Sequence, residues 1–402
     1  MLSKPKKTLI ASTIGSTFGY STIGATSFGV FVLPLSGAFG WGRGDISVAF
    51  TIMSYTVALL SPFAGMLADR YGVRRVLLPS ILAFGLSLAF AALLSGGIAH
   101  LYGLYFIMAL AALGTTPVIY SRAVVQWFDD NRGLALGVAL TGVGVGTALI
   151  PIIVQAAVGR WGWQGGYLSL SLIVLGLTLP VCWAWIYSAR PIDPDAPPTL
   201  DLGDTLREAV GTRAYWQLVA GFALLTVFPV GVLAHLIPML QDRGVSPGTA
   251  ALAASTLGGA IIFGRVGTGW LLDRFFAPRV VIACMGAAAM GLGILATGAS
   301  GAWAFFAVIL VGFGVGADTD FMAYMVSRYH GKRAYGRIVG TVYLAMGLGQ
   351  GIGPLLMGYS QQVYGGYTLG LIALCATTLL GIVPLALLGP YPVFAKREPE
   401  PA

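Results

Sequence analysis

Charged residues are scarce in this chain. Only 9% of its 402 residues are Asp, Glu, Lys or Arg, and 57% are hydrophobic, whereas a soluble domain carries about 25% charged residues. So few charges cannot cover a water-facing surface, and we expect most of the surface to face lipid. The net charge of +8 comes with no basic face or aromatic platform, so the composition does not favour nucleic-acid binding.

Groups that could hold a metal, bind a nucleotide or form covalent intermediates are also few. Cys182, Cys284 and Cys375 lie far apart in apolar runs, with no CxxC or Cys/His cluster. No GxxxxGK[ST] loop occurs, which disfavours an ATP-driven pump. No nucleophile–base set is evident. We therefore expect no metal, no cofactor, no disulfide framework and no enzymatic activity.

Long apolar runs dominate what is present. A membrane-spanning helix needs about 20 apolar residues to cross about 30 Å. Twelve such runs can be marked, at 8–34, 46–68, 76–96, 100–125, 133–157, 166–188, 214–240, 247–272, 280–299, 302–326, 336–358 and 367–389. The first is too long for a signal peptide. We expect an all-α membrane protein with a six-helix bundle at 1–188, a linker at 189–213 and a second six-helix bundle at 214–402.

The positions of Lys and Arg predict the orientation. Nineteen of the 23 lie in the tails and in every second turn, three lie in the opposite turns (Arg43, Arg160 and Arg243), and Arg265 lies inside a span. Cytoplasmic loops of membrane proteins are enriched in Lys and Arg. We therefore expect a monomeric, multi-pass protein of the plasma (bacterial inner) membrane, with both termini in the cytoplasm and the lipid bilayer as its surroundings.

The two halves of the sequence repeat one another. The segment Gly65–Arg70 aligns with Gly269–Arg274 at an offset of 204. Five positions of the fifth span align with identical residues of the eleventh at an offset of 203. Gly133, Gly137, Gly144, Gly146 and Pro151 fall on Gly336, Gly340, Gly347, Gly349 and Pro354. This repeat predicts two halves in parallel orientation, related by an axis along the membrane normal, with a site between them. Glycines inside apolar helices predict close helix packing.

The stretch "GMLADRYGVRR" resembles the GxxxDRxGxR loop of the major facilitator superfamily, and the layout of the whole chain agrees with it. The resemblance implies a cytoplasmic gate that holds the halves together when the transporter faces outward. A carboxylate at a positive helix end beside arginines suits that role. The implied gate residues are Gly65, Asp69, Arg70, Gly72, Arg74 and Arg75, with a second-half copy at Asp273 and Arg274.

Within that superfamily the chain resembles the monocarboxylate transporter branch and the oxalate/formate-antiporter-like relatives. The resemblance rests on "SFGVFVLPLSGAFGWGRGDIS", "WFDDNRGLALG", "SRYHGKRAYGRIVG" and the spacing of Arg265, Gly269 and Asp273. It implies transport of a small organic anion with a carboxylate, together with a proton or in exchange for another anion, and it implies that Arg265 holds the carboxylate. The chain departs from animal carriers at Ile261, where they have Asp.

Ionisable residues inside spans predict the transport site, because charge in a membrane is costly and usually faces a cavity. The Arg265 guanidinium stays charged and can bind a carboxylate through two hydrogen bonds. Asp318 and Asp320 lie at a similar depth and point in different directions, so at most one faces Arg265; we favour Asp318 for proton coupling. The alternative for either aspartate is a hydrogen-bonded packing role.

Several polar residues inside apolar spans could line a pocket for a small anion. These are Tyr20, Tyr120, Tyr324, Tyr343 and Gln350; the alternative is packing with satisfied hydroxyl groups. His235 is interpreted as a hydrogen-bonded packing residue. We expect a secondary transporter of monocarboxylates such as lactate, pyruvate or formate, working by proton symport or anion exchange. The alternatives are efflux of drugs or amphiphilic metabolites, or a membrane sensor without transport.

Overall fold

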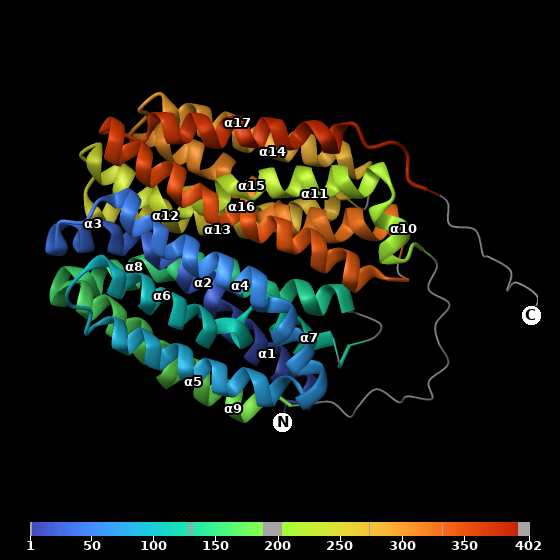
Figure 1. Cartoon of the computed structure of the whole chain (residues 1–402), viewed down its shortest axis with the longest axis horizontal. Coiled ribbons are helices and arrows are strands. Elements are labelled where there is room, and N and C mark those ends of the chain that lie inside the picture. Colours follow the sequence, from blue (N-terminus) through green and yellow to red (C-terminus); the bar gives the residue numbers. More distant parts are fainter. Residues whose placement is uncertain are drawn as a thin grey trace, which may run out of the picture.

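The protein is a bundle of long helices that lie nearly side by side (Figure 1). The computed structural model describes residues 2–125, 127–128, 132–187, 203–272, 274–331 and 333–392. Within these ranges the chain is helical apart from turns and one isolated bridge between Gly203 and Gly331. The predicted all-α class is confirmed.

The first half of the chain forms nine α-helices and three short helices of other types within the described residues. They are α1 (Lys4–Thr17), α2 (Tyr20–Thr22), the π-helix η1 (Ile23–Ser27), α3 (Phe28–Phe39), α4 (Arg43–Tyr71), α5 (Val73–Ala91), α6 (Ile98–Ala112), the 3-10 helix η2 (Leu113–Thr115), α7 (Pro117–Val125), α8 (Arg132–Ile173), the π-helix η3 (Val174–Thr178) and α9 (Leu179–Trp185). The first crossing is therefore broken near its middle, which the apolar run at 8–34 does not predict.

The second half continues with α10 (Leu206–Val210), α11 (Arg213–Leu225), α12 (Val227–Asp242), α13 (Pro247–Leu272), α14 (Ala277–Ala296), α15 (Gly301–His330), α16 (Tyr335–Tyr364) and α17 (Thr368–Ala386). The short α10 lies inside the stretch expected to be a linker, 189–213, most of which lies outside the described residues. Thr205 caps α10, because its side chain accepts from the Glu208 N–H and the Glu208 carboxylate accepts from the Thr205 N–H.

Eleven segments of the described chain are long and apolar enough to cross a membrane. One of them, 135–185, has 51 residues, about twice what a crossing needs. Its helix α8 is interrupted at Trp161 and Gly162, where Gly162 has φ 68°, a conformation that glycine adopts without strain. This segment turns back there and makes two crossings, so the described helices agree with the expected twelve.

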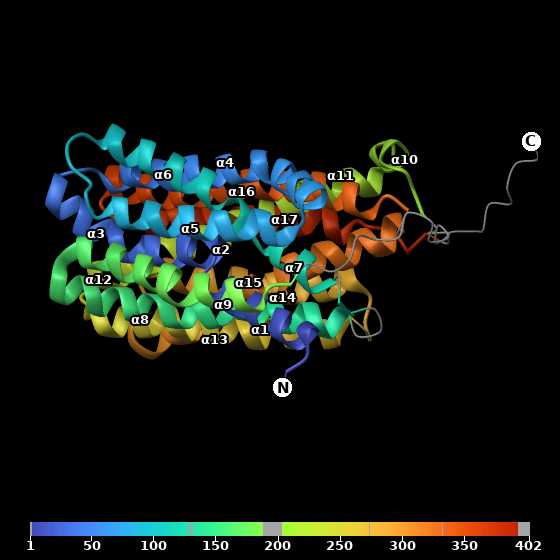
Figure 2. The same cartoon turned by 90° about the horizontal axis from the view of Figure 1, so that it is seen from below.

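The helices gather in two groups according to their order in the chain, the first half in blue to green and the second in yellow to red (Figure 1). We call the end of the bundle where α1 begins and α17 ends the proximal end, and the opposite end, with the α3–α4 and α12–α13 turns, the distal end. Two seams join the groups: α4 packs on α16 along one side, and α8 packs on α13 along the other (Figure 2).

Glycine allows the helices within each group to pack at backbone distance. A Cβ atom on Gly146 would collide with the Thr17 carbonyl of α1, and one on Gly349 would collide with the Ala223 carbonyl of α11. Gly146 and Gly349 are equivalent in the sequence repeat. The glycine pattern that the repeat revealed therefore serves helix packing in both halves, as small residues do in membrane bundles.

Candidate functional site

Arg265 lies on α13 where the two groups of helices meet. Its Nε donates to the Gly316 carbonyl of α15 at 3.3 Å, and its Nη1 donates to the Leu140 carbonyl of α8 at 3.2 Å. The side chain is partly buried. Arg265 therefore bridges the second half, to which α13 and α15 belong, and the first half, to which α8 belongs.

A chain of polar side chains crosses between the halves beside Arg265. Asp318 on α15, two residues beyond Gly316, is 6% exposed and interacts electrostatically with Tyr343 of α16. Tyr343 in turn interacts with Tyr20 of α2, and the Tyr20 hydroxyl interacts with Ser54 of α4. Four of the helices that meet between the groups thus contribute one polar group each.

The break in the first crossing places Tyr20 in this row of polar side chains. The α-helix stops after Thr17, and the π-helix η1 follows the single turn of α2. The Thr22 hydroxyl donates to the Ser16 carbonyl at 2.8 Å, which satisfies an acceptor that the break leaves without its usual helical donor. Short π-helices often occur at functional sites. The break could not be read from the apolar pattern, because Thr and Ser occur throughout this crossing.

The other predicted pocket residues are Tyr120, Tyr324 and Gln350. Tyr120 is fully buried within the first half, where its ring packs on Gly15 and Gly19 of the first crossing. Its hydroxyl is among the buried groups of the described residues with no hydrogen-bond partner. Tyr324 interacts with Tyr391 toward the proximal end. Gln350 is partly buried on α16.

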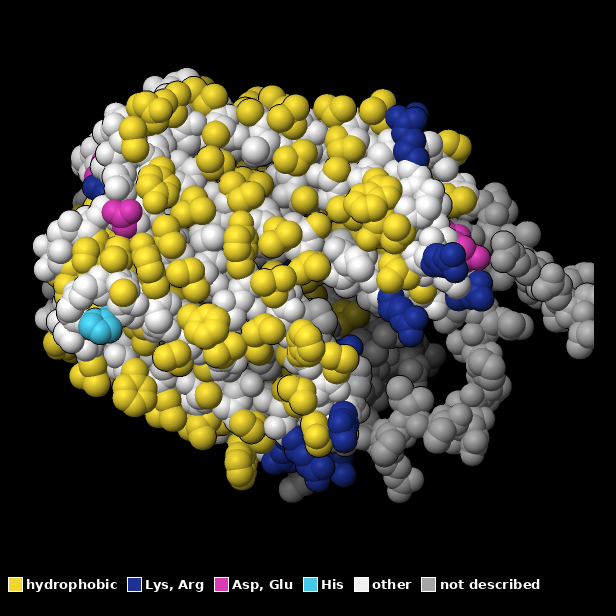
Figure 3. Space-filling model, in the orientation of Figure 1, with side chains coloured by type: hydrophobic (Ala, Val, Ile, Leu, Met, Phe, Trp, Pro, Cys, Tyr) yellow, Lys and Arg dark blue, Asp and Glu magenta, His cyan; other side chains and the backbone are white. Residues whose placement is uncertain are grey.

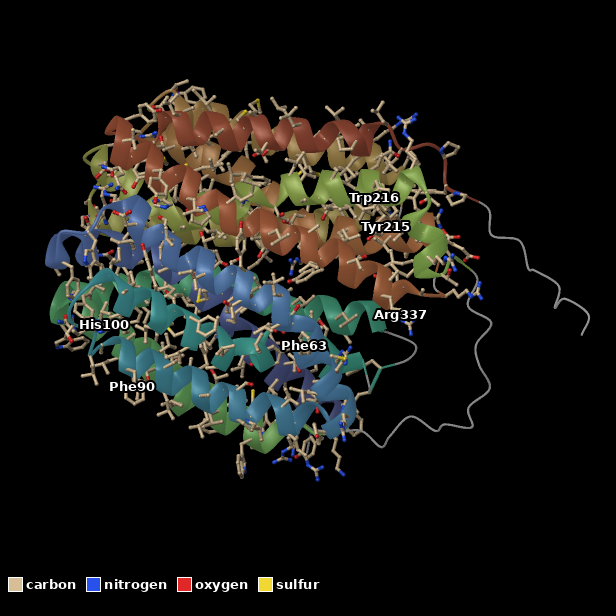
Figure 4. All side chains as sticks on the ribbon, in the orientation of Figure 1. Phe63, Phe90, His100, Tyr215, Trp216 and Arg337 are labelled. Atoms are coloured by element: carbon tan, nitrogen blue, oxygen red, sulfur yellow. The ribbon has the colours of Figure 1, made fainter. Side chains whose placement is uncertain are left out.

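The side chain of Asp320 lies outside the described residues. Arg337, the single cation of α16, lies at the proximal end of that helix (Figure 4). Within the described residues no group of three or more His, Cys, Asp or Glu could hold a metal ion. The roles of the predicted site residues therefore stay predictions, with Arg265, Asp318, Tyr20 and Tyr343 placed where the halves meet.

The predicted gate loop joins α4 to α5 at the proximal end. Gly72 makes the turn between the helices with φ 86°, which glycine allows. The Gly65 carbonyl accepts from Arg122 Nη1 of α7 at 2.8 Å. The residue pattern did not identify this contact, because an arginine at a helix end is usually explained by snorkelling. The side chain of Asp69 lies outside the described residues.

The arginines of this loop contact aromatic rings and their own half of the chain. Arg74 donates to the Trp183 carbonyl at 2.8 Å and lies over the Trp183 ring. Arg70 lies over the ring of Tyr71, and Arg75 is exposed. In the second copy, Arg274 stacks 3.9 Å from the centre of the Trp270 ring, and Asp273 lies outside the described residues. The gate role of these residues stays a prediction.

The distal end is held closed by contacts between the halves. Arg43 at the start of α4 forms an ion pair with Asp242 at the end of α12, with Nη2 3.0 Å from Oδ1. Arg43 Nη1 also donates to the Tyr367 hydroxyl at 3.0 Å. Gln362 of α16 accepts from the Gly44 N–H at 2.8 Å. We call Arg43, Asp242, Tyr367 and Gln362 the distal latch.

The sequence offered one signal for the latch, since Arg43 is one of only three cations in the turns expected to be outside. Toward the proximal end the surface is instead hollowed between the two groups of helices (Figure 3). The described structure is therefore closed at the distal end, and its hollow lies on the side of the gate loop.

Comparison with known families decides the classification. The family model described as Major Facilitator Superfamily matches residues 10–317. The chain belongs to the Major Facilitator Superfamily. This agrees with the helical bundle, the two groups of helices and the resemblance of the Gly65–Arg75 loop.

The relatives within this superfamily include proteins named as transporters. The chain is 27% identical to the "Uncharacterized MFS-type transporter YcxA" of Bacillus subtilis over 274 residues, which cover 64% of this chain and 63% of that one. The match thus spans less than two thirds of YcxA. It is 27% identical to "Monocarboxylate transporter 13" of Rattus norvegicus over 368 residues, 88% of this chain and 82% of the relative.

A solved structure shares the fold of this superfamily member. It is a bacterial homolog of the human lysosomal transporter Spinster, described as inward-facing and occupied. The TM-score is 0.75 at 17% sequence identity, and the match covers 96% of each chain. This likeness shows the fold alone. The family match and the eleven apolar segments of the described residues make the chain a multi-pass membrane protein of the superfamily.

Proposed function

We propose that this superfamily member is a secondary transporter of small organic anions that carry a carboxylate, such as lactate, pyruvate or formate. The observation that carries the proposal is Arg265, a permanent cation inside a membrane helix that hydrogen-bonds to backbone carbonyls of both halves. The similarity to a protein named "Monocarboxylate transporter 13" supports the same substrate class.

The chemistry of the contacts favours an exchange of partners at Arg265. Its bonds to the Gly316 and Leu140 carbonyls are 3.3 and 3.2 Å long, longer than the 2.7–2.9 Å that a guanidinium makes with a carboxylate. A substrate carboxylate would offer two charged acceptors in place of these neutral ones. Binding would also release Arg265 from Leu140, which lies on the opposite half.

Asp318 is our candidate for the proton site. It is nearly fully buried and interacts with Tyr343, and Arg265 contacts its helix two residues away. A substrate anion that engages Arg265 would neutralise the charge of that cation. Asp318 would then take a proton more readily. This links a carboxylate to a proton without further machinery, whereas exchange for another anion would use Arg265 alone.

The distal latch and the proximal hollow support alternating access. The latch closes one end between Arg43 and Asp242, while the surface is hollowed at the other (Figure 3). We propose that the proximal end, which holds the Lys- and Arg-rich turns, faces the cytoplasm. A transport cycle then requires the distal latch to open while the gate loop at the proximal end closes.

Uptake into proteoliposomes tests the proposal. Radiolabelled lactate, pyruvate, formate and oxalate would be offered with and without an inward proton gradient to the wild type, to Arg265→Ala and to Arg265→Lys. We expect a proton gradient to drive uptake of a monocarboxylate, Arg265→Ala to lower it on the order of 100-fold, and Arg265→Lys to retain a larger part. Arg160→Ala, which removes an exposed arginine of α8, is the control and should transport normally.

Two results would redirect the proposal. Carboxylate uptake that Arg265→Ala leaves intact would contradict the assignment of the substrate site, and would favour efflux of an amphiphilic compound. Uptake that requires an internal anion and ignores the proton gradient would favour exchange over symport.

A further inference from the structure

His235 is a buried imidazole that the proposed transport site does not use. It lies on α12, fully buried, at the distal end between the halves. Its Nε2 lies 3.0 Å from the Ser47 hydroxyl of α4. This contact is made across the interface between the halves, one helical turn away from Arg43 of the distal latch.

The polar neighbours of the ring are neutral. The Ser47 hydroxyl donates to the Arg43 carbonyl at 2.8 Å, and its contact with His235 Nε2 can be made in either tautomer of the ring. Nδ1 is buried without a hydrogen-bond partner among the described side chains. The closed arrangement thus accommodates the neutral ring.

A second proton on the ring would be poorly placed while the distal end is closed. The guanidinium of Arg43 lies near the ring, and its partner Asp242 is already engaged in the ion pair. The Tyr367 ring lies 5.5 Å from the imidazole, centre to centre. The Pro354 carbonyl of α16, a neutral acceptor, lies near the ring.

No other ionisable group of the described helices around α12 compensates for that charge. The helix α3 has no ionisable residue, and those of α11, α13 and α15 lie toward the proximal end of their helices. On α16, Tyr359 and Tyr364 lie near the distal end and are exposed. Asp45 of α4 is engaged by the Gln362 side chain, whose Nε2 donates to its carboxylate at 3.2 Å, and α17 carries one ionisable side chain, the thiol of Cys375. The groups that face the ring are therefore one cation, one paired carboxylate and one phenol.

We propose that His235 is a second proton site, which takes a proton from the distal side when the latch opens and so couples the pH on that side to opening. This rests on the alternating-access cycle of the proposed function. Opening separates α4 from α12, breaks the Ser47 contact and exposes the ring to water. The proton binds the open state and not the closed one, so the open fraction grows as the pH falls below about 6.5, where an exposed imidazole titrates.

The test measures opening directly and needs no substrate. Spin labels at Ser95→Cys and Ser300→Cys, exposed at the distal end of the two halves, would report their separation in protein whose three native cysteines are replaced. Between pH 8 and pH 5 we expect a long-distance population to grow, by roughly tenfold per pH unit at most for one proton. His235→Gln keeps a donor for Ser47 and does not titrate, so its distances should not change with pH.

His100→Gln is the matched control, because His100 is the exposed imidazole at the same end (Figure 4). It should respond to pH like the wild type. A pH response that persists in His235→Gln, that disappears in His100→Gln, or that is missing from the wild type would overturn the proposal. Failure of carboxylate uptake would overturn the proposed substrate. The distance measurement would still decide whether protonation of His235 favours opening of the distal end.

A second measurement covers the case in which the cysteine-free protein does not fold. The native chain has only three histidines, so their ¹³C-labelled imidazole signals can be assigned by single replacements. We expect the His235 signal to show a neutral ring at pH 8 and a growing doubly protonated form toward pH 5. A signal that stays in the neutral form throughout would contradict the proposal.

Discussion

The two seams between the halves share an equivalent hydrogen bond. On the α4–α16 seam the Thr51 hydroxyl donates to the Gly351 carbonyl at 2.8 Å, and on the α8–α13 seam the Ser255 hydroxyl donates to the Ala148 carbonyl at 2.6 Å. Thr51 and Ser255 are 204 residues apart, and Ala148 and Gly351 are 203 apart. These are the offsets of the sequence repeat, so the repeat is preserved in individual hydrogen bonds.

The match continues one to two turns further along. A Cβ atom on Gly347 would collide with Ala58 on one seam, and a Cβ atom on Gly144 would collide with Ile262 on the other. These pairs are again related by 204 and 203 residues. Both seams therefore close through a glycine on one helix and a small or flexible apolar side chain on its partner.

The seams diverge at the next turn, where the candidate site lies. One seam has Arg265 bonded to the Leu140 carbonyl, and the equivalent positions of the other are Ser61 and Tyr343. Ser61 bonds within its own helix to the Ala58 carbonyl at 3.2 Å. Tyr343 turns instead to Tyr20 and Asp318. The two halves thus hold equivalent positions at the same place on each seam. On one seam these positions carry the cation Arg265, and on the other Tyr343 belongs to a row of hydroxyl groups that ends at the Asp318 carboxylate.

The largest expected effect comes from replacing Arg265, with its repeat equivalent Ser61 as the comparison. Arg265→Ala should lower carboxylate uptake on the order of 100-fold, because two charge-assisted hydrogen bonds are worth roughly 3 kcal/mol together. Its repeat equivalent Ser61→Ala should change uptake less than about twofold, since that hydroxyl bonds within its own helix. Initial rates in proteoliposomes measure both. Equal losses of uptake would mean that the difference between Arg265 and Ser61 has no role in transport.

The next effect concerns packing that the halves share. Gly349→Ala and its equivalent Gly146→Ala should each lower the free energy of unfolding by about 1–3 kcal/mol, because the added methyl group meets a backbone carbonyl that cannot move aside. Gly340→Ala and Gly137→Ala, where nothing lies within 4 Å, are the controls. Thermal unfolding in detergent would show the difference. A loss at only one of the two packed glycines would show that the halves differ in packing.

The third prediction concerns the distal latch, whose Arg43 has no charged equivalent in the other half. Arg43 has Pro247 as its repeat equivalent, so only one side of the distal end carries the ion pair. Arg43→Gln should shift the closed protein toward the open form about tenfold at pH 7.5, as removal of one charged hydrogen-bond partner costs about 1.5 kcal/mol. The Ser95–Ser300 label distance would report it. The exposed Arg160, replaced by Gln, should leave the distance unchanged.

The smallest effect tests the matched hydroxyls themselves. Thr51→Val and Ser255→Ala should each favour opening by roughly threefold, because hydrogen bonds between membrane helices average about 0.6 kcal/mol. The two losses should be similar and should add in the double variant, as distant sites do. The same label distance serves as the readout. Thr256→Val is the control, since its hydroxyl donates to Leu252 of its own helix; a much larger loss at either seam position would end the equivalence.

The sequence predicted the architecture well because its signals are long or periodic. The apolar runs gave the helices, and the offset of 203 to 204 residues anticipated the paired seams. The break at Trp161–Gly162 falls in the turn between the expected fifth and sixth spans. The apolar pattern could not show the break near Tyr20, because π-helical geometry depends on how the neighbouring helices pack and not on hydropathy.

The site was only partly predictable for a related reason. Arg265 and Asp318 stood out because charge inside a span is costly. Their neighbours did not, because Leu140 and Gly316 contribute backbone carbonyls, which every residue possesses. The same holds for Gly65, whose carbonyl binds Arg122.

The sequence by itself determined that this chain is a duplicated helical membrane protein with one arginine that breaks the symmetry of the repeat. Only the tertiary structure decided which groups meet. It paired Arg43 with Asp242, His235 with Ser47 and Tyr20 with Tyr343, residues that are between 188 and 323 positions apart. Such pairs depend on the relative placement of the two halves, which hydrophobic burial fixes without leaving a local pattern along the chain.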